Sequence, residues 1–224
     1  MNGIARDLST RRLIATVAVA LLLATSGCIG FILGNAPAEF TAANATAGED
    51  ALAETGYGLN ESRTVVENRT LDELGNRTVR VEGHANLYTK SDEFLDRQQQ
   101  VGMFAAVSVP QVEVAGRSFN PISDQSNAEL VDRFQSEISA EYRDVDLTAT
   151  GSKSVDGVLG KRANVTRFTG TSEFQGREVE VAIYVTKVKH DGDWVVLMGA
   201  HPTQRPEEEF NVEALMQSVE HESE

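Results

Sequence analysis

Cys28 is the only cysteine in the 224-residue chain, and the segment before it would present its thiol for chemistry. Arg11 and Arg12 are basic, residues 13–24 form an uncharged apolar run, and residues 25–27 are small. This order is typical of a secretory signal. Small residues let an extended segment enter a peptidase, and the thiol that follows is a nucleophile that can take a diacylglyceryl-type lipid. The segment therefore predicts a signal peptide that ends just before Cys28, and lipid attachment at that residue.

The same residues resemble a lipoprotein box, with Thr25 at a position where leucine is more usual. The arginine pair at residues 11–12 also resembles the twin-arginine export signal, which carries folded proteins across the membrane. The general secretory route remains the alternative, because any signal peptide carries basic residues.

An uncleaved membrane anchor is the competing interpretation of this segment. Residues 13–33 would span about 31 Å as a helix, enough for a hydrocarbon core of roughly 30 Å. Small residues dilute the second half of the run, and simple spanning does not explain a cysteine behind small residues, so we favour the lipoprotein. Both interpretations place everything after residue 34 outside the cell, because the arginines stay on the cytoplasmic side.

The composition is strongly acidic, with a net charge of −14. Removal of residues 1–27 takes away three arginines and one aspartate and leaves −16. Nucleic acid is excluded as a partner, since binding to phosphates needs an excess of Lys and Arg. The chain has five lysines among its 20 basic residues, and this acidity suits high salt, where self-repulsion is screened. A halophilic archaeon is thus the expected source, and an ordinary acidic secreted protein is the alternative.

Five sequons of the form N-x-[ST] occur in the exported part, more than chance would give. They predict a glycoprotein with possible attachment sites at Asn44, Asn60, Asn68, Asn76 and Asn164. With one cysteine there is no disulfide framework, so the domain must be stabilised by its own core.

The four histidines carry no zinc-protease spacing. His190 next to a turn and His221 near the C-terminus are expected to be solvated. His84 and His201 lie on or at the ends of predicted strands, and could form a metal or acid–base site together with Asp193 or a glutamate of the 207–209 run.

Other catalytic signatures are absent from the sequence. A blue-copper centre needs a thiolate inside the domain, and the calcium-like start at Asp144 and Asp146 loses its spacing. Glu207, Glu208 and Glu209 are interpreted as a solvated approach to the last helix, and Trp194 as core packing. We therefore expect no catalytic residues, no metal and no cofactor.

Alternation of apolar and polar residues predicts a strand at residues 78–88, and an apolar run predicts a central strand at 103–109. Further strands are expected at residues 62–67, 146–155 and 161–169. The clearest unit is a long hairpin from residue 178 to residue 201 that turns at Asp191-Gly192, a pair that tolerates the positive φ of a tight turn.

Three helices are expected. Thr46 and Glu49 form a capping box for a short helix that stops at Gly56, and Ser126 with Glu129 forms another for an amphipathic helix to residue 142. A last helix begins at the cap Asn211, and its apolar face is formed by Val212, Leu215, Met216 and Val219.

These elements predict an α+β fold with helices packed on a mostly antiparallel sheet. The expected organisation is a signal peptide over 1–27, a lipid-anchored tether with a short helix over 28–59, and a single domain over 60–224. The strings NPIS, LGKRANVTRFTG and VEALMQSVEHE resemble the haloarchaeal lipoproteins of unknown function. The order of elements over about residues 98 to 221 is also similar to the PsbP-like α/β/α sandwich. Neither resemblance implies catalytic residues.

The function expected from these features is that of a lipid-anchored extracellular envelope protein, a non-enzymatic binding or interaction module whose ligand and envelope partner the sequence does not identify. One alternative is an envelope enzyme built on His84 and His201 with nearby carboxylates. Another is a small solute-binding lipoprotein, disfavoured because about 160 residues barely form the two lobes of such a receptor.

Overall fold

The computed structural model describes residues 37–72, 75–94, 97–114, 117–119, 122–138, 146–174 and 177–222. The predicted signal peptide with Arg11 and Arg12, and the predicted lipid site Cys28, lie outside these residues. Within them, none of the helices has the length and apolar character needed to span a bilayer.

The described residues form two compact units. One comprises the residues up to Phe40 together with Val66–Val81, and the other comprises Thr41–Val65 together with the residues from Glu82 onward. The larger unit holds both hydrophobic clusters described below.

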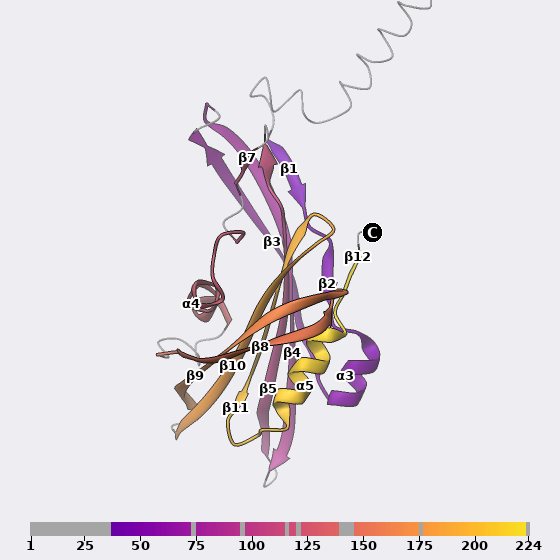
Figure 1. Ribbon diagram of the computed structural model, residues 1–224, viewed down its shortest axis with the longest axis vertical. Helices are drawn as coiled ribbons and strands as arrows, with labels where there is room; N and C mark the ends of the chain where they lie inside the picture. Colours follow the sequence, from indigo (N-terminus) through magenta and orange to yellow (C-terminus); the bar gives the residue numbers. More distant parts are fainter. Residues whose placement is uncertain are drawn as a thin grey trace, which may run out of the picture. The chain divides into compact units, whose positions relative to one another are not determined.

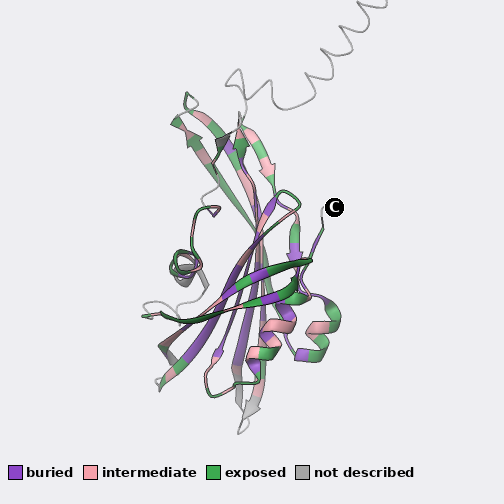
Figure 2. Ribbon diagram, in the orientation of Figure 1, coloured by how far each residue is buried: buried purple, intermediate pink, exposed green. Residues whose placement is uncertain are grey.

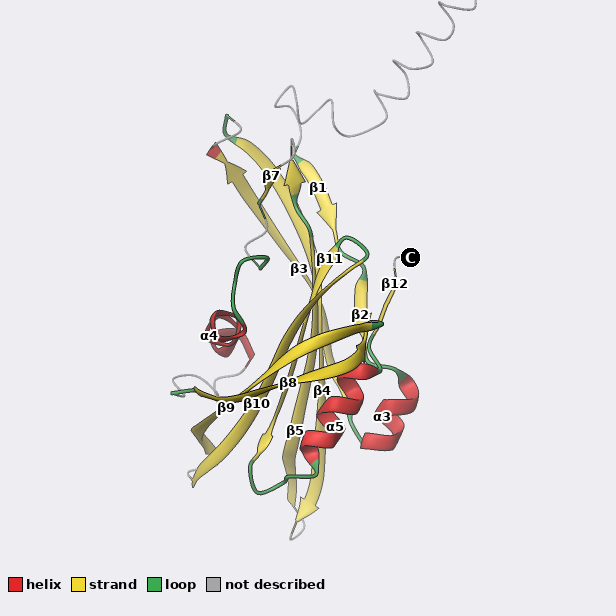
Figure 3. Cartoon of the chain, in the orientation of Figure 1, coloured by secondary structure: helices red, strands yellow, loops and turns green. Residues whose placement is uncertain are grey.

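The dominant element is an eight-stranded sheet with the order β1-β4-β5-β11-β10-β9-β8, in which β3 also pairs with β4 (Figures 1 and 3). Its strands are β1 (Ala38–Thr41), β3 (Gly58–Leu71), β4 (Arg77–Phe94), β5 (Arg97–Pro110), β8 (Thr148–Val158), β9 (Lys161–Phe174), β10 (Arg177–His190) and β11 (Asp193–Pro202). Two small sheets pair β2 (Asn44–Thr46) with β12 (Glu220–Glu222) and β6 (Glu113–Val114) with β7 (Arg117–Ser118). The central pairs from β4 to β8 are antiparallel.

Helices cover both faces of the larger unit's sheet (Figure 1). On one face, α3 (Glu49–Thr55) and α5 (Glu208–Gln217) pack on a cluster centred on Phe104, Leu197 and Leu215. On the other face, α4 (Asn127–Ile138) packs Leu130 and Val131 against β10 and β11. Alternate residues of one strand enter opposite clusters, as the period of two requires.

The predicted hairpin is confirmed. Its strands are β10 and β11, with Lys189 opposite Trp194, and the turn has positive φ at Asp191 (45°) and Gly192 (90°). The predicted cap of the middle helix is also confirmed. The Ser126 backbone N–H donates to Glu129 at 2.7 Å, and the Glu129 N–H donates back to the Ser126 hydroxyl at 3.3 Å.

The prediction of an α+β fold of the PsbP-like α/β/α sandwich type is wrong, because the protein is β-rich. The three described helices have 7, 12 and 10 residues, whereas β3, β5, β9 and β10 each have 14 and β4 has 18. Hydrophobic periodicity located the apolar middle of each strand only. The polar ends continue the backbone pairing without a buried side chain to mark them, as in β3, which begins at Gly58, four residues before the predicted start.

Residues in the second half of the predicted 28–59 tether belong to the folded body. Ala45, Ala47 and Tyr57 are buried in the α5 cluster, and β2 pairs with β12 near the C-terminus. Small residues suggested a flexible linker, but here they allow close packing of neighbouring backbones.

Two predicted helix caps are wrong. Thr46 lies in β2, so α3 begins after Gly48 without a side-chain cap, although it stops at Gly56 in the left-handed conformation as predicted. The last helix begins at Glu208, so Asn211 lies within its first turn, while the predicted apolar face, completed by Val219 just beyond the helix, is buried.

Candidate functional site

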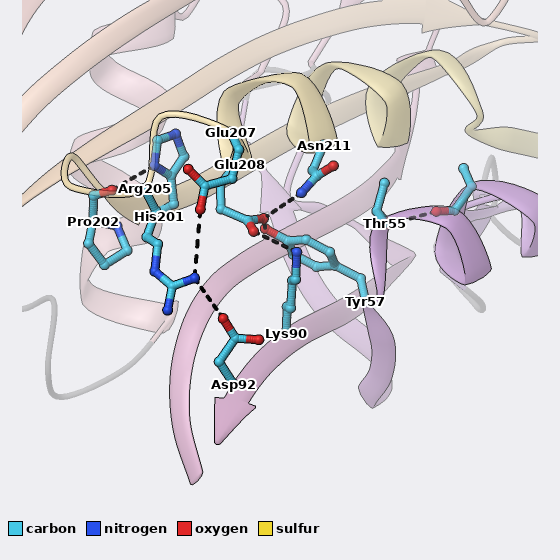
Figure 4. A network of polar contacts seen from close by, with 11 residues as sticks. Thr55, Tyr57, Lys90, Asp92, His201, Pro202, Arg205, Glu207, Glu208 and Asn211 are labelled. Atoms are coloured by element: carbon cyan, nitrogen blue, oxygen red, sulfur yellow. Dashed lines mark hydrogen bonds and ion pairs between the residues drawn. The ribbon is translucent and has the colours of Figure 1, made fainter. Parts of the chain in front are cut away.

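A polar cluster around a buried carboxylate lies under the first turn of α5 (Figure 4). Glu208 is 1% exposed. Its Oε1 accepts a hydrogen bond from Lys90 Nζ of β4 at 2.6 Å, and its Oε2 accepts from Tyr57 Oη at 3.1 Å and Asn211 Nδ2 at 3.0 Å. We call Tyr57, Lys90, Glu208 and Asn211 the Glu208 cluster.

Backbone geometry brings Tyr57 into this cluster. A Cβ on Gly102 of β5 would lie 2.0 Å from Tyr57 Oη, so only glycine leaves room for the phenol. Glu208 precedes Val212 by four residues and therefore shares the apolar face of α5. The prediction that Glu207, Glu208 and Glu209 are all solvated is wrong for Glu208.

The geometry of the Glu208 cluster suits the positioning of α5 against the sheet better than it suits proton transfer. Both carboxylate oxygens are occupied by donors, one of them the charged Lys90, whose side chain is only 20% exposed. A buried carboxylate needs such partners to offset its lost hydration. The cluster thereby connects α5, β4 and the chain after α3.

A second polar group surrounds Tyr184 on the same face of the sheet. Its hydroxyl donates to Glu209 at 2.9 Å and accepts from Arg167 Nε at 3.2 Å, and burial raises the pKa of the phenol. Lys153 donates to Glu209 at 2.8 Å, and this contact lowers the pKa of the Glu209 carboxyl. These side chains form a paired network that runs from the buried Tyr184 to Lys153 and Glu209 at the surface.

His201 stacks on Tyr184, with ring centroids 5.5 Å apart and planes inclined by 16°. Its Nδ1 lies 2.9 Å from the Pro202 carbonyl oxygen, which can only accept, so Nδ1 carries the proton. Its Nε2 is buried and has no hydrogen-bond partner among the described protein atoms.

The structure does not bring His84 and His201 together. His84 lies opposite Ser108, and it contacts Thr64 Oγ1 at 3.4 Å on the exposed β3–β4 side. On β11, the residue before His201 lies opposite Met103. Ser108 and Met103 are five residues apart on β5, which corresponds to about 17 Å along the strands. The proposed acid–base pair therefore has no support in the fold.

Instead, the structure joins the two histidines that were predicted to be solvated. His190 Nδ1 and His221 Nδ1 are 3.1 Å apart, and His221 Nε2 lies 3.2 Å from Asp193 Oδ2. His221 is 4% exposed because β12 pairs with β2 and carries the imidazole inward. The prediction that His221 is solvated, which rested on its position near the C-terminus, is wrong.

Burial raises the pKa of Asp193, although the Ala43 backbone N–H, 2.7 Å from Oδ2, and His221 act in the opposite direction. The folded chain therefore holds this proton more tightly than the unfolded chain does. The contribution of Asp193 to stability is greatest below the ordinary aspartate pKa of about 3.9 and declines as the pH rises through the folded pKa.

We expect Asp193→Asn to remove this decline, so that the urea unfolding midpoint of the variant rises relative to that of wild type as the pH is increased from acid to neutral. Asp132→Asn changes an exposed aspartate of α4 and should leave the pH profile as it is in wild type. Parallel profiles for wild type and Asp193→Asn would contradict the assignment.

An open hollow of about 490 Å³ lies at the start of α4. Lys187 borders it, but its Nζ is directed to backbone oxygens of residues 122, 123 and 125 and lies 5.1 Å from the Trp194 ring centroid. Burial lowers the pKa of Lys187. Over the described ranges, no group of three or more His, Cys, Asp or Glu side chains is placed to hold a metal ion.

All five predicted glycosylation asparagines are exposed. Asn44 differs from the others because its Oδ1 accepts a hydrogen bond from the buried Asn86 Nδ2 at 2.8 Å. Asn76 has a positive φ of 58° next to the β3–β4 turn. The sites lie on β2, β3, that turn and β9.

The chain belongs to a family described as a domain of unknown function, DUF6517, whose match covers residues 44–220. No curated protein matches the sequence. Among solved structures, LpqN, involved in cell envelope biogenesis of Mycobacterium tuberculosis, is similar over 78% of this chain and 96% of that chain, with 7% identity and a TM-score of 0.32. A likeness this weak carries no argument about fold or function.

Proposed function

We propose that the protein is a lipid-anchored component of the outer face of the cell membrane, and that its β-rich domain is a non-enzymatic binding or interaction module. The observation that carries the proposal is the single Cys28 behind a basic pair and an apolar run. The thiol takes the lipid, and the domain is exported. The acidic composition supports a high-salt habitat and a haloarchaeal source.

The start of the folded body supports a short connection to the membrane. The first described strand begins at Ala38, ten residues after Cys28. Ten residues reach at most about 35 Å when fully extended. The domain would therefore lie close to the membrane, where the exposed asparagines are available for glycans.

A binding role is also supported by the arrangement of the ionisable groups. The Glu208 carboxylate is saturated with donors, and the His84 and His201 pair invoked for an envelope enzyme is separated. The long exposed strand β3 offers backbone and side chains to a partner instead.

Cys28→Ser tests the anchor. We expect the wild-type chain to remain with membranes until detergent is added, and its intact mass to correspond to a chain that begins at Cys28 and carries lipid. The serine variant should lack that lipid mass and partition differently. Ser26→Ala, which keeps a small residue in the same segment, should behave as wild type.

Unchanged mass and partitioning in Cys28→Ser would refute the lipid anchor and favour the uncleaved helix. Intact mass would at the same time reveal glycans on the five asparagines.

A further inference from the structure

Strand β3 is an exposed edge of the sheet. Among the described strands it pairs with β4 only, and every side chain along it is exposed except Arg69 and Leu71, which are partly buried (Figure 2). Leu59 is 58% exposed and Val65 40%. A long edge of this kind offers backbone N–H and C=O groups to another strand.

The charges on one face of β3 have a self-complementary order. Successive residues of this face are Leu59, Glu61, Arg63, Val65, Glu67, Arg69 and Leu71. When two copies of the strand run antiparallel with Val65 opposite Val65, each Glu61 faces an Arg69 and each Arg63 faces a Glu67. The two leucines at the ends also face each other.

Neighbouring registers lose this complementarity. A shift of two residues in one direction places Glu61 opposite Glu67, and a shift of two in the other direction places Arg63 opposite Arg69. Like charges directly opposite each other destabilise a strand pair. A two-fold axis perpendicular to the sheet places residues of the same strand face opposite each other. A shift by an odd number of residues would place residues of different faces opposite each other, so this symmetry excludes it.

We propose that β3 pairs with β3 of a second copy of this chain, so that two sheets join into one across a two-fold axis at Val65. Glu67 already contacts Arg69 of its own strand, with Nη2 3.1 Å from Oε2. In the pair, Arg63 of the second copy joins this contact and a continuous row of alternating charges crosses the interface. The surface consists of this one strand, and about 40 Å of it would be paired.

The other face of β3 is compatible with the same register. Its residues are uncharged: Asn60, Ser62, Thr64, Val66, Asn68 and Thr70. Side chains in a strand stand roughly perpendicular to the sheet. Glycans on Asn60 or Asn68 would therefore project away from the face and leave the backbone edge open. The pairing does not depend on the lipid anchor.

Cysteine cross-linking of the full-length chain in its membranes tests the register. Under mild oxidation, Val65→Cys should give a disulfide-linked dimer on a non-reducing gel, because residue 65 meets itself. Leu59→Cys alone should give no more dimer than the wild-type chain. Leu59→Cys combined with Leu71→Cys should cross-link again.

Cross-linking of Val65→Cys no greater than that of Leu59→Cys would overturn the proposal, and so would a product between Val65→Cys and a different protein. These outcomes leave the Cys28→Ser result unaffected, so failure of the pairing and failure of the anchor are distinguishable.

Charge exchange in the detergent-extracted full chain provides the second test, with sedimentation as the measurement. Glu61→Arg places two like-charge contacts in each dimer and should weaken dimerisation about tenfold. Adding Arg69→Glu should restore it to within about threefold. Absence of recovery in the double variant would overturn the register.

A pair of valine variants controls for effects on the monomer. Val65→Lys puts two like charges at the axis and should abolish the dimer. Val66→Lys, equally exposed on the opposite face, should keep it. Equal loss in both variants would contradict the proposal.

Discussion

Glu208→Ala is expected to lower the free energy of unfolding by about 3 to 5 kcal/mol, the range for breaking a buried ion pair by removing one partner. The substitution leaves Lys90 Nζ without the carboxylate 2.6 Å away, and it leaves Tyr57 and Asn211 without their acceptor. Chemical denaturation of wild type and variant measures the difference.

Two further variants separate the effect of the buried charge on stability from the effect of an alanine at the start of α5. Glu207→Ala changes the neighbouring residue, which is exposed and makes only a 3.6 Å contact with Arg205, so it should lie within about 0.5 kcal/mol of wild type. Glu208→Leu combined with Lys90→Met removes both charges and should be more stable than Glu208→Ala. A loss below about 1 kcal/mol in Glu208→Ala would show that Glu208 is not held as the structure has it.

Sequence periodicity predicted the middles of the long strands and the buried face of the last helix because these depend on neighbours along the chain. The turn at Asp191-Gly192 and the cap formed by Ser126 and Glu129 are decided within a few residues, and both are present. Fold class was missed because it depends on how far each strand continues. Whether a polar strand end is paired depends on the adjacent strand, and the sequence of that end has no hydrophobic pattern that would indicate the pairing.

The polar clusters could not be predicted from the sequence, because the residues that form them are far apart along the chain. His221 meets Asp193 because β12 returns to β2, and Tyr57 reaches Glu208 through the space left by Gly102. Glu208 alone had a local signal, since it lies four residues before Val212 on the apolar face of its helix. The charge of Glu208 suggested a solvated side chain, whereas its spacing from Val212 correctly indicated a buried one.

Gly199→Ala is the second substitution with a large expected effect. A Cβ at this position of β11 would lie 2.3 Å from Val212 Cγ1 and 2.6 Å from its Cγ2. Val212 is 1% exposed in the core between α5 and the sheet, so it has no open space to move into. Overpacking of this kind costs about 1 to 3 kcal/mol. We expect the upper end because α5 is held by the Glu208 cluster and β11 is paired on both sides, with β5 and β10.

The cause of that loss can be isolated with a double-mutant cycle on Gly199 and Val212. Val212→Ala opens a cavity and destabilises the protein by itself, but it also removes both methyl groups that an added Cβ would meet. Gly199→Ala with Val212→Ala should therefore lose less than the sum of the single variants, with a coupling of about 0.5 to 3 kcal/mol. Gly151→Ala in β8, where a Cβ meets nothing within 4 Å, is the matched control and should not destabilise the protein. Strict additivity in the cycle would mean that α5 does not approach β11 as closely as the glycine implies, and the position of Glu208 on the same helix would then be in doubt as well.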